Sequence, residues 1–407
     1  MKKLDILFYL YGMDGGGAER HVLYLLQRLD RSRFSPRLFL KCADGPYLSR
    51  VPADVPVESE YGTFEEEART PTVWKELRLI RGLGRYLRER PPDLIYGRMY
   101  SSALVAGLAK LWSGCRSPLV ASEGIFPSVG ILPDLGRFKF PRLYFVRKVQ
   151  RDVSAVIVCT AKAMVEDGIA FYGCAREKMR IIPNGLDIET IDRARREPPG
   201  HPWADGVYAL VVAMGRLCPQ KGFDILLEAF APLSTILPSA RLVILGKGQD
   251  RESLVRQAAA LGIGDKVDFP GWLPNPHAVI SRASVFSLSS RYEGFPNALL
   301  EAMACCVPVV AVDCPSGPSE ILEGDVGILV PRDDAKELSD ALRKVLQAPA
   351  LRDHLAREGR WRVEERYSLD QMISAYEQLF EEVAASGTGR GLRAERKTPE
   401  IRSSSSE

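Results

Sequence analysis

Short apolar runs alternate with amphipathic segments along this chain, and the alternation occurs twice. Residues 4–11, LDILFYLY, predict a buried strand, and residues 18–29, AERHVLYLLQRL, carry apolar side chains at helical spacing. The pattern starts again after residue 206 with VYALVVAMGRL and the helical GFDILLEAFAPL. Buried strands that alternate with helices are typical of parallel sheets. The sequence therefore predicts an α/β protein made of two doubly wound, Rossmann-like domains.

Changes in composition predict the domain boundaries. Residues 192–206, DRARREPPGHPWADG, concentrate proline, glycine and charge, which is typical of a linker between domains 1–191 and 207–365. Segment 366–385 predicts a C-terminal helix that can return to the first domain. The tail 386–407 has almost no large apolar residue, so we expect it to be disordered.

Composition also excludes several classes of protein. The formal net charge is only +3, so no global field favours nucleic acid as a partner. The first apolar run is interrupted by Asp5 and ends in a glycine loop, which argues against a signal peptide, and no run approaches the roughly 18 apolar residues of a membrane span. None of the eight cysteines forms a C-x-x-C pair. We expect reduced thiols and a cytoplasmic protein that can lie at the inner face of the cell membrane.

A glycine-rich loop, YGMDGGGAER (11–20), connects the first strand to the first helix. Gly15, Gly16 and Gly17 let the backbone turn sharply and approach a ligand closely. The helix N-terminus behind them offers free N–H groups and a partial positive charge, which suit a phosphate or a polar acceptor. The loop is neither a G-x-G-x-x-G nor a Walker sequence, so an ordinary strand-to-helix turn stays open as the alternative.

Two glutamates eight positions apart, Glu293 and Glu301, flank a second strand-to-helix turn. The turn contains Gly294, Phe295, Pro296 and Asn297. Ligands of open parallel sheets bind over this edge, where the first N–H groups of the helix are unpaired. A carboxylate one turn into the helix can accept hydrogen bonds from a ribose diol, and Glu293 can bind a hydroxyl ahead of the phosphates. The pattern predicts a ligand with sugar, phosphates and ribose in line, and surface carboxylates are the alternative.

Two cations, Arg216 and Lys221, lie in the loop GRLCPQKGFD (215–224) after the first strand of the second domain. A departing nucleoside diphosphate needs its growing negative charge stabilised by a metal or by fixed cations and helix N–H groups. The chain contains no D-x-D triplet, the usual source of metal ligands. We therefore expect metal-independent chemistry with no bound cofactor. Loop residues that merely face water are the alternative.

Five segments of the second domain together resemble the retaining GT-B glycosyltransferases of family 4. They are GRLCPQKGFDILLEAF, ARLVILGKGQDRESL, FPGWLPNP, SSRYEGFPNALLEAMA and VPVVAVDCPSGPSEIL. The resemblance covers residues 207–332 and is looser over 1–190, through GGGAER and IIPNGLD. It implies a GT-B fold, in which two Rossmann-like domains face each other across a cleft. The C-terminal domain then holds the nucleotide-sugar donor and the N-terminal domain holds the acceptor.

The resemblance also implies individual roles. Glu301 holds the ribose, Arg216 and Lys221 hold the diphosphate, and Glu293 contacts the donor sugar. The other donor-binding positions that it implies are Gly15, Gly16, Gly17, Trp272, Leu273, Gly294, Phe295, Pro296, Asn297, Ala298 and Leu299.

Two positions depart from the family pattern. Glu123, in LVASEGIF, stands where many members carry a histidine, which resembles bacterial enzymes that build lipid-linked or surface polysaccharides. We expect Glu123 and Glu19 on the acceptor side. Cys306 stands where the family usually has glycine before VPVV.

A basic aromatic stretch, GRFKFPRLYFVRKVQR (136–151), carries six Lys or Arg, four aromatic residues and no acid. Basic side chains attract anionic headgroups and aromatic rings insert at the interface. The stretch predicts an anionic membrane surface as a partner. An ordinary amphipathic helix with its basic face in water stays open as the alternative.

Taken together, these features predict a retaining, metal-independent hexosyltransferase that moves a sugar from a nucleotide sugar, UDP-linked, to a glycan acceptor, lipid-linked, in surface polysaccharide or glycan biosynthesis. The acceptor hydroxyl attacks from the face that the diphosphate leaves, and a β-phosphate oxygen takes its proton. Two alternatives stay open, a UDP-sugar epimerase of similar shape and a nucleotide-sugar binding protein without catalysis.

Overall fold

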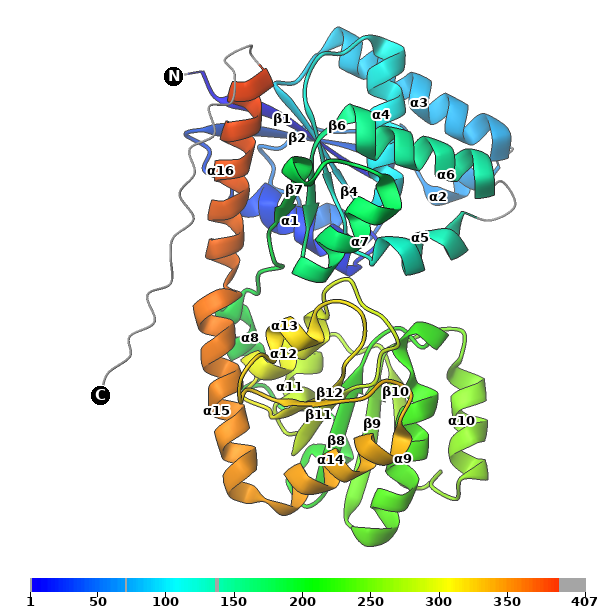
Figure 1. The fold of residues 1–407 in the computed structure, drawn as a ribbon, viewed down its shortest axis with the longest axis vertical. Coiled ribbons are helices and arrows are strands. Elements are labelled where there is room, and N and C mark those ends of the chain that lie inside the picture. The colour runs from blue at the N-terminus through cyan, green and yellow to red at the C-terminus, as the bar shows by residue number, and fades with distance from the viewer. Residues whose placement is uncertain (1, 70–71, 136–138, 388–407) are drawn as a thin grey trace.

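The computed structural model describes residues 2–69, 72–135 and 139–387. Two parallel sheets build two domains that lie one above the other along the long axis of the molecule (Figure 1). The strand orders are β3-β2-β1-β4-β5-β6-β7 and β10-β9-β8-β11-β12-β13. In both sheets the order reverses beside the first strand, which is the doubly wound arrangement. The predicted α/β class and the two Rossmann-like domains are confirmed, whereas residues 388–407 of the predicted tail lie outside the described residues.

The N-terminal domain is a seven-stranded sheet with helices on both faces. Its strands are β1 (Leu4–Leu10), β2 (Phe34–Cys42), β3 (Val57–Tyr61), β4 (Leu94–Arg98), β5 (Leu119–Ser122), β6 (Ser154–Cys159) and β7 (Met179–Ile181). Its helices are α1 (Gly17–Arg28), α2 (Phe64–Ala68), α3 (Thr72–Glu89), α4 (Tyr100–Ser113), α5 (Pro127–Asp134), α6 (Lys139–Lys148), α7 (Lys162–Tyr172) and α8 (Ile188–Ala194). All five residues of β4 are buried, as expected for a central parallel strand.

The C-terminal domain repeats this architecture with six strands. The strands are β8 (Ala209–Met214), β9 (Ala240–Leu245), β10 (Val267–Gly271), β11 (Val285–Leu288), β12 (Val309–Val312) and β13 (Ile328–Val330). The helices are α9 (Phe223–Ile236), α10 (Arg251–Ala260), α11 (Pro276–Ile280), α12 (Asn297–Ala304), α13 (Pro318–Ile321), α14 (Ala335–Gln347) and α15 (Pro349–Arg366). Among the described residues, no helix has both the length and the apolar character needed to cross a bilayer.

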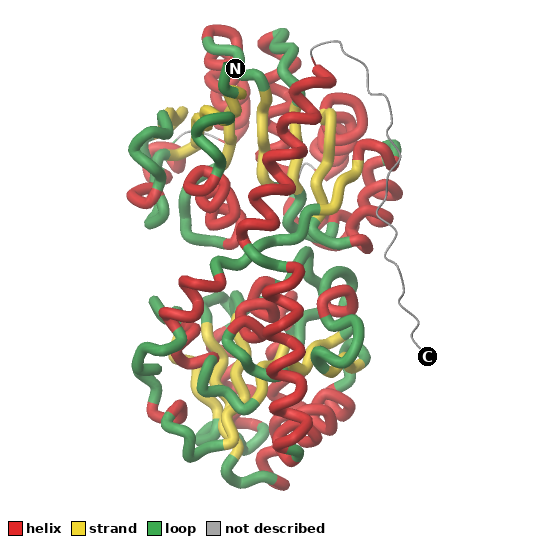
Figure 2. Tube along the Cα trace, turned by 90° about the vertical axis from the view of Figure 1, so that its left-hand side faces the viewer, coloured by secondary structure: helices red, strands yellow, loops and turns green. Residues whose placement is uncertain are grey.

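The chain passes between the domains twice, and the two passages lie side by side (Figure 2). Leu186 of the first passage forms a parallel bridge with Ser368 of the second. The final helix, α16 (Leu369–Gly387), then packs on the N-terminal domain, where Tyr376 and Phe380 are fully buried. The predicted linker 192–206 begins inside α8, because its first residues continue that helix.

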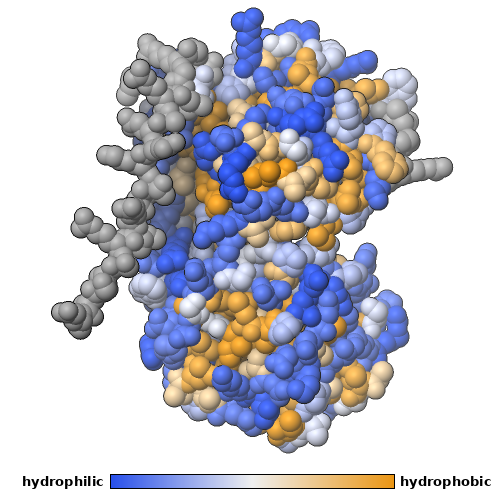
Figure 3. All heavy atoms as spheres, viewed as in Figure 1, coloured by the Kyte–Doolittle hydropathy of each residue, from blue (hydrophilic) through white to orange (hydrophobic). Residues whose placement is uncertain are grey.

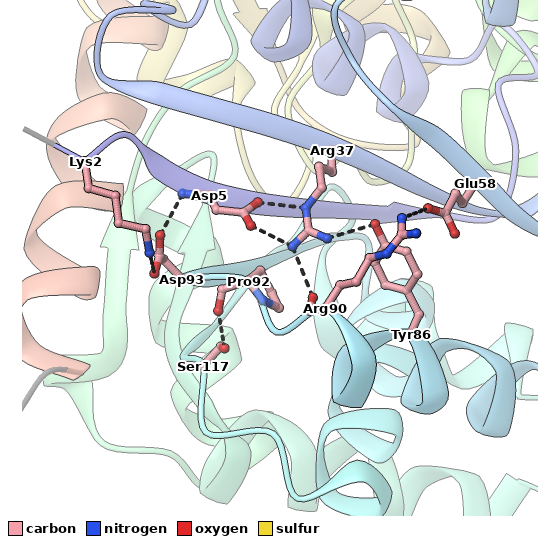
Figure 4. A network of polar contacts seen from close by, with 9 residues as sticks. All are labelled: Lys2, Asp5, Arg37, Glu58, Tyr86, Arg90, Pro92, Asp93 and Ser117. Atoms are coloured by element: carbon pink, nitrogen blue, oxygen red, sulfur yellow. Dashed lines mark hydrogen bonds and ion pairs between the residues drawn. The ribbon is translucent and has the colours of Figure 1, made fainter.

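A polar network ties the N-terminal sheet together at the amino ends of its strands (Figure 4). Arg37 of β2 makes two hydrogen bonds of 2.7 and 2.8 Å to the carboxylate of Asp5 in β1. The same guanidinium donates to the Tyr86 hydroxyl at the end of α3. The carboxylate of Asp93 accepts from the backbone N–H of Asp5. These contacts lie at the sheet edge opposite the carboxyl ends, so they fix the sheet and leave the other edge to a ligand.

Candidate active site

The carboxyl ends of the two sheets face each other across a cavity of about 460 Å³. The molecular surface is indented between the domains (Figure 3). Ten of the predicted donor-site residues line the cavity: Gly16, Gly17, Arg216, Lys221, Glu293, Gly294, Phe295, Asn297, Ala298 and Glu301. They follow β1 in one domain and β8 and β11 in the other, which are the strands beside which the strand order reverses. This position is the usual ligand crevice of doubly wound sheets.

Glu301 lies in the cavity wall on α12 and is held by two partners that the sequence analysis did not name. Arg20 of α1, from the other domain, contacts Oε1 at 2.6 Å, and Nε2 of His277 lies 3.2 Å from Oε2. Burial alone would raise the pKa of Glu301, but the charge of Arg20 and the hydrogen bond from His277 outweigh burial and hold the pKa at about 2. Glu301 is therefore an anion at neutral pH.

Glu293 and Lys221 form a second acid–base pair in the same wall. Nζ of Lys221 lies 2.6 Å from Oε1 of Glu293, and the hydroxyl of Ser290 donates to the same oxygen. Lys221 reaches this position because Gly222 follows it with a φ of +60°, and a side chain at Gly222 would collide with the carbonyl oxygen of Ser289. The ion pair between Lys221 and Glu293 thus connects the loop after β8 to the turn after β11.

The N-terminus of α12 is contacted by the other domain. Asn184, in the first interdomain passage, donates from Nδ2 to Oδ1 of Asn297 at 3.0 Å. Oδ1 of Asn184 accepts at 3.3 Å from Arg98, the last residue of β4. Both Asn184 and Arg98 line the cavity, and neither was predicted from the sequence. Within the described residues, no three His, Cys, Asp or Glu side chains gather as a potential metal site.

Seven predicted residues do not line the cavity: Gly15, Glu19, Glu123, Trp272, Leu273, Pro296 and Leu299. The Trp272 side chain is 64% exposed, and Leu273 packs against the hydrophobic core. Leu299 is fully buried. Glu19 accepts hydrogen bonds from the backbone of Gly16 and of its own residue, as in a helix N-terminal capping box.

Glu123 is turned away from the cavity although its neighbour Gly124 lines it. Its carboxylate is fully buried and accepts a 2.6 Å hydrogen bond from Gln150, in the π-helical turn Val149–Val153 that follows α6. Burial raises the pKa of Glu123 to about 7. The Glu123 carboxylate is therefore buried beside the cavity and does not line it, and its role on the acceptor side stays a prediction.

Cys306, the departure from the family glycine, has a φ of +60°. It follows the end of α12, where a left-handed residue commonly terminates a helix and is usually glycine. The side chain is exposed, so the departure adds backbone strain and no clash with the core.

Two family models match this chain. The model for "Glycosyl transferases group 1" matches residues 203–362, and the model for "Glycosyltransferase Family 4" matches residues 15–190. The matches thus fall on the C-terminal and the N-terminal domain, respectively.

Individual relatives agree with these matches. The lipopolysaccharide core biosynthesis glycosyltransferase LpsE of Rhizobium meliloti is 32% identical over 251 residues, 60% of this chain and 70% of the relative. The N-acetylgalactosamine-N,N'-diacetylbacillosaminyl-diphospho-undecaprenol 4-alpha-N-acetylgalactosaminyltransferase of Campylobacter jejuni is 27% identical over 368 residues, 86% of this chain and 92% of the relative. Anabaena HepE, solved in complex with UDP and glucose, has a TM-score of 0.77 at 21% identity and covers 93% of this chain and 100% of its own. The chain belongs to the group 1 glycosyltransferases and has their two-domain GT-B fold.

Proposed function

We propose that this glycosyltransferase moves a sugar from a UDP-sugar to a lipid-linked glycan acceptor during polysaccharide biosynthesis, with retention of anomeric configuration and without a metal ion. The observation that carries the proposal is that a buried carboxylate, Glu301, and two cations, Arg216 and Lys221, line one cavity at the N-terminus of α12. A ribose diol, a diphosphate and a sugar can be bound in that order along this wall.

The donor is oriented by complementary charges. Glu301 accepts hydrogen bonds from the ribose hydroxyls, and Arg216 and Lys221 bind the diphosphate. The N-terminus of α12 lies in the same cavity wall and adds a partial positive charge, although the N–H groups of Asn297 and Leu299 already donate to the carbonyls of Phe295 and Pro296. Glu293, which Lys221 and Ser290 hold in the turn after β11, contacts the donor sugar.

In the proposed reaction, the bond between the sugar C1 and the β-phosphate oxygen breaks while the acceptor oxygen approaches from the same face. The electron pair of the broken bond stays on the diphosphate, whose negative charge therefore increases. The attraction between this charge and the surrounding cations and helix N-terminus becomes stronger as the reaction proceeds. The acceptor proton passes to a β-phosphate oxygen. Each atom of the donor is accounted for without a side-chain base.

Names of similar proteins support the choice of substrates. HepE was solved with UDP and with UDP-glucose, LpsE acts in lipopolysaccharide core biosynthesis, and the Campylobacter enzyme is named for an acceptor on diphospho-undecaprenol. UDP-sugar and a lipid-linked glycan are therefore the substrate classes to test first.

The exposed aromatic residues of α6 support an acceptor at a membrane. Phe140 is 80% exposed and Tyr144 58% exposed, one helical turn apart, and Phe145 is also exposed. Basic side chains flank them, with Arg147 stacked over Phe171 at 5.2 Å. Hydrophobic and hydrophilic residues are interspersed on the face of the domain around α6 (Figure 3). Aromatic and basic side chains on one face suit an anionic lipid surface, where the protein then acts from the cytoplasmic side. Residues 136–138 of the predicted stretch lie outside the described residues.

The test of this function is a thermal-shift panel of UDP-, GDP- and ADP-sugars, followed by turnover with the best ligand. The transferase is expected to release UDP slowly without an acceptor and to retain this activity in EDTA. An epimerised donor would instead support the epimerase alternative, and binding without any turnover would support the binding protein. Restoration of lost activity by Mn²⁺ after EDTA would refute the metal-independent reaction. The anomeric configuration of the product, measured by NMR, tests retention.

A further inference from the structure

Arg98 is a buried guanidinium in the cavity wall, and its hydrogen-bond partners among the described residues are all neutral. Only 3% of the residue is exposed. Nη1 donates to the Ser122 hydroxyl at 2.6 Å and Nη2 to Oδ1 of Asn184 at 3.3 Å, while the buried Nε has no hydrogen-bond partner among the described residues. The carboxyls of Glu19 and Glu123 act on Arg98 electrostatically but form no ion pair with it. Burying a charge is costly unless an opposite charge compensates it. Arg98 therefore lies in an environment that an anionic ligand would complete.

The ion pairs of the other cations in the cavity wall show which positive charges have no carboxylate partner. Arg20 and Lys221 each have a carboxylate at 2.6 Å, Glu301 and Glu293 respectively. Of the four cations in the wall, Arg98 and Arg216 have no carboxylate at ion-pair distance among the described residues. One comes from each domain. Arg98 and Arg216 thus add two uncompensated positive charges for a nucleoside diphosphate ester, beside Lys221, whose charge Glu293 partly compensates.

The topology places Arg98 opposite the expected diphosphate site. It ends β4, which neighbours β1 where the strand order of the N-terminal sheet reverses. Asn184 connects its guanidinium to Asn297 at the start of α12. A Cβ at Gly124 would lie 3.3 Å from Nη2 of Arg98, and a side chain at Gly294 would collide with the Gly124 carbonyl oxygen. Gly124 therefore lies beside both Arg98 and the turn after Glu293, and all three line the cavity.

We propose that Arg98 is a further catalytic residue, which binds the diphosphate of the donor from the N-terminal domain while Arg216 binds it from the C-terminal domain. This inference rests on the proposed function. As the C1–O bond breaks, its electron pair adds negative charge to the diphosphate, and the acceptor proton later reduces that charge. Arg98 keeps its own proton throughout. Because the charge is largest at the transition state, Arg98 contributes more to turnover than to donor binding.

The fixed guanidinium also predicts that lysine cannot fully replace arginine at this position. The planar group makes two hydrogen bonds from different nitrogens, to Ser122 and Asn184, and leaves Nε unpaired. A lysine has one nitrogen and cannot reproduce this geometry. The structure therefore predicts that Arg98→Lys retains the positive charge but recovers only part of the activity.

The experiment compares Arg98→Gln and Arg98→Lys with the matched control Arg362→Gln. Arg362 is also buried, also bonds only to neutral groups and also has an unpaired Nε, but it lies away from the cavity. UDP and UMP affinities are measured by calorimetry, and turnover is measured with the best UDP-sugar. For Arg98→Gln we expect UDP affinity to fall about tenfold, UMP affinity to change less than twofold and turnover to fall about a hundredfold. For the control Arg362→Gln we expect UDP affinity, UMP affinity and turnover to stay at the wild-type level.

Equal losses for UDP and UMP, or unchanged UDP affinity and turnover, would overturn the role of Arg98. A loss confined to the KM of the acceptor would also overturn it, because the anion would then belong to the acceptor. If Arg98→Gln does not fold, the same comparison is made with Arg98→Lys, for which intact turnover is the refuting result. Failure of the wild-type protein to bind UDP would instead refute the proposed function itself.

Discussion

The ion pair between Arg20 and Glu301 predicts an unusual effect of removing a cation from a site for an anionic ligand. Arg20 contacts Oε1 of Glu301 at 2.6 Å, and the carboxylate is almost completely buried while the Arg20 side chain is 29% exposed. A ribose that uses Glu301 has to displace this contact. We therefore predict that Arg20→Ala binds UDP more tightly than the wild-type protein.

The magnitude follows from the geometry of the pair. A hydrogen bond to a charged group contributes about 1.5–3 kcal/mol, and partial exposure of Arg20 reduces this to about 1–2 kcal/mol. A tightening of UDP by about 5- to 30-fold is expected. Removal of Arg20 also leaves Glu301 buried without its cation, so the free energy of unfolding should fall by about 1–3 kcal/mol in the absence of nucleotide.

A double-mutant cycle separates this explanation from others. Glu301→Gln alone should weaken UDP by about 1.5–3 kcal/mol, because a charge-assisted contact to the ribose is lost. In that background Arg20→Ala should have no further effect, since the two residues act through the same contact. Calorimetric titration with UDP of all four proteins measures the cycle. If Arg20→Ala weakens UDP binding in the Glu301→Gln variant, Arg20 binds the nucleotide directly and the displacement argument is wrong.

Four further predictions concern separate parts of the molecule. Lys221→Ala should lower turnover by about a hundredfold and donor affinity much less, measured by steady-state kinetics; an equal loss in both would contradict a role that grows in the transition state. Because burial raises the pKa of Glu123 to about 7, above its unfolded value near 4.3, the stability that it contributes is complete below about pH 4 and is lost as the pH rises through 7. Glu123→Gln should therefore exceed the wild type in unfolding free energy by about 3 kcal/mol at pH 8 and lose this advantage at pH 4, and a pH-independent difference in denaturant titrations would refute the assignment. Cys306→Gly should stabilise the protein by about 0.5–1 kcal/mol in chemical denaturation, since glycine adopts the +60° φ without strain; destabilisation would show that the thiol contributes packing. Replacing Phe140 and Tyr144 by serine should weaken sedimentation with anionic vesicles and slow transfer to a lipid-linked acceptor but not to a short soluble one; an equal effect on both acceptors would favour the solvated helix.

The sequence alone determined most elements and the cavity residues of the C-terminal domain. Strands such as β1 and β8 are continuous apolar runs because a central parallel strand is buried on both faces, so they are recognisable without neighbours. Arg216, Lys221, Glu293 and Glu301 were predictable because each lies within a few residues of a strand-to-helix turn, and such turns meet at one edge of the sheet. The polar edge strand β3, VESEY, was missed because its pattern of exposure does not separate it from a loop.

Only the tertiary structure decided which N-terminal residues face that site. Arg20 and Glu301 are 281 positions apart and Asn184 and Asn297 are 113 apart, so no local pattern relates them. The sequence predicts Glu123 on the acceptor side, and only the tertiary structure shows that Gln150 of the π-helical turn holds its buried carboxylate. Arg98 has neutral hydrogen-bond partners on β5 and on the first interdomain passage, and none of the described carboxylates lies at ion-pair distance from it. The direction of a side chain at the end of a strand depends on the residues that pack beside it. For Glu123 and Arg98 these residues, Gln150 and Asn184, are distant in sequence.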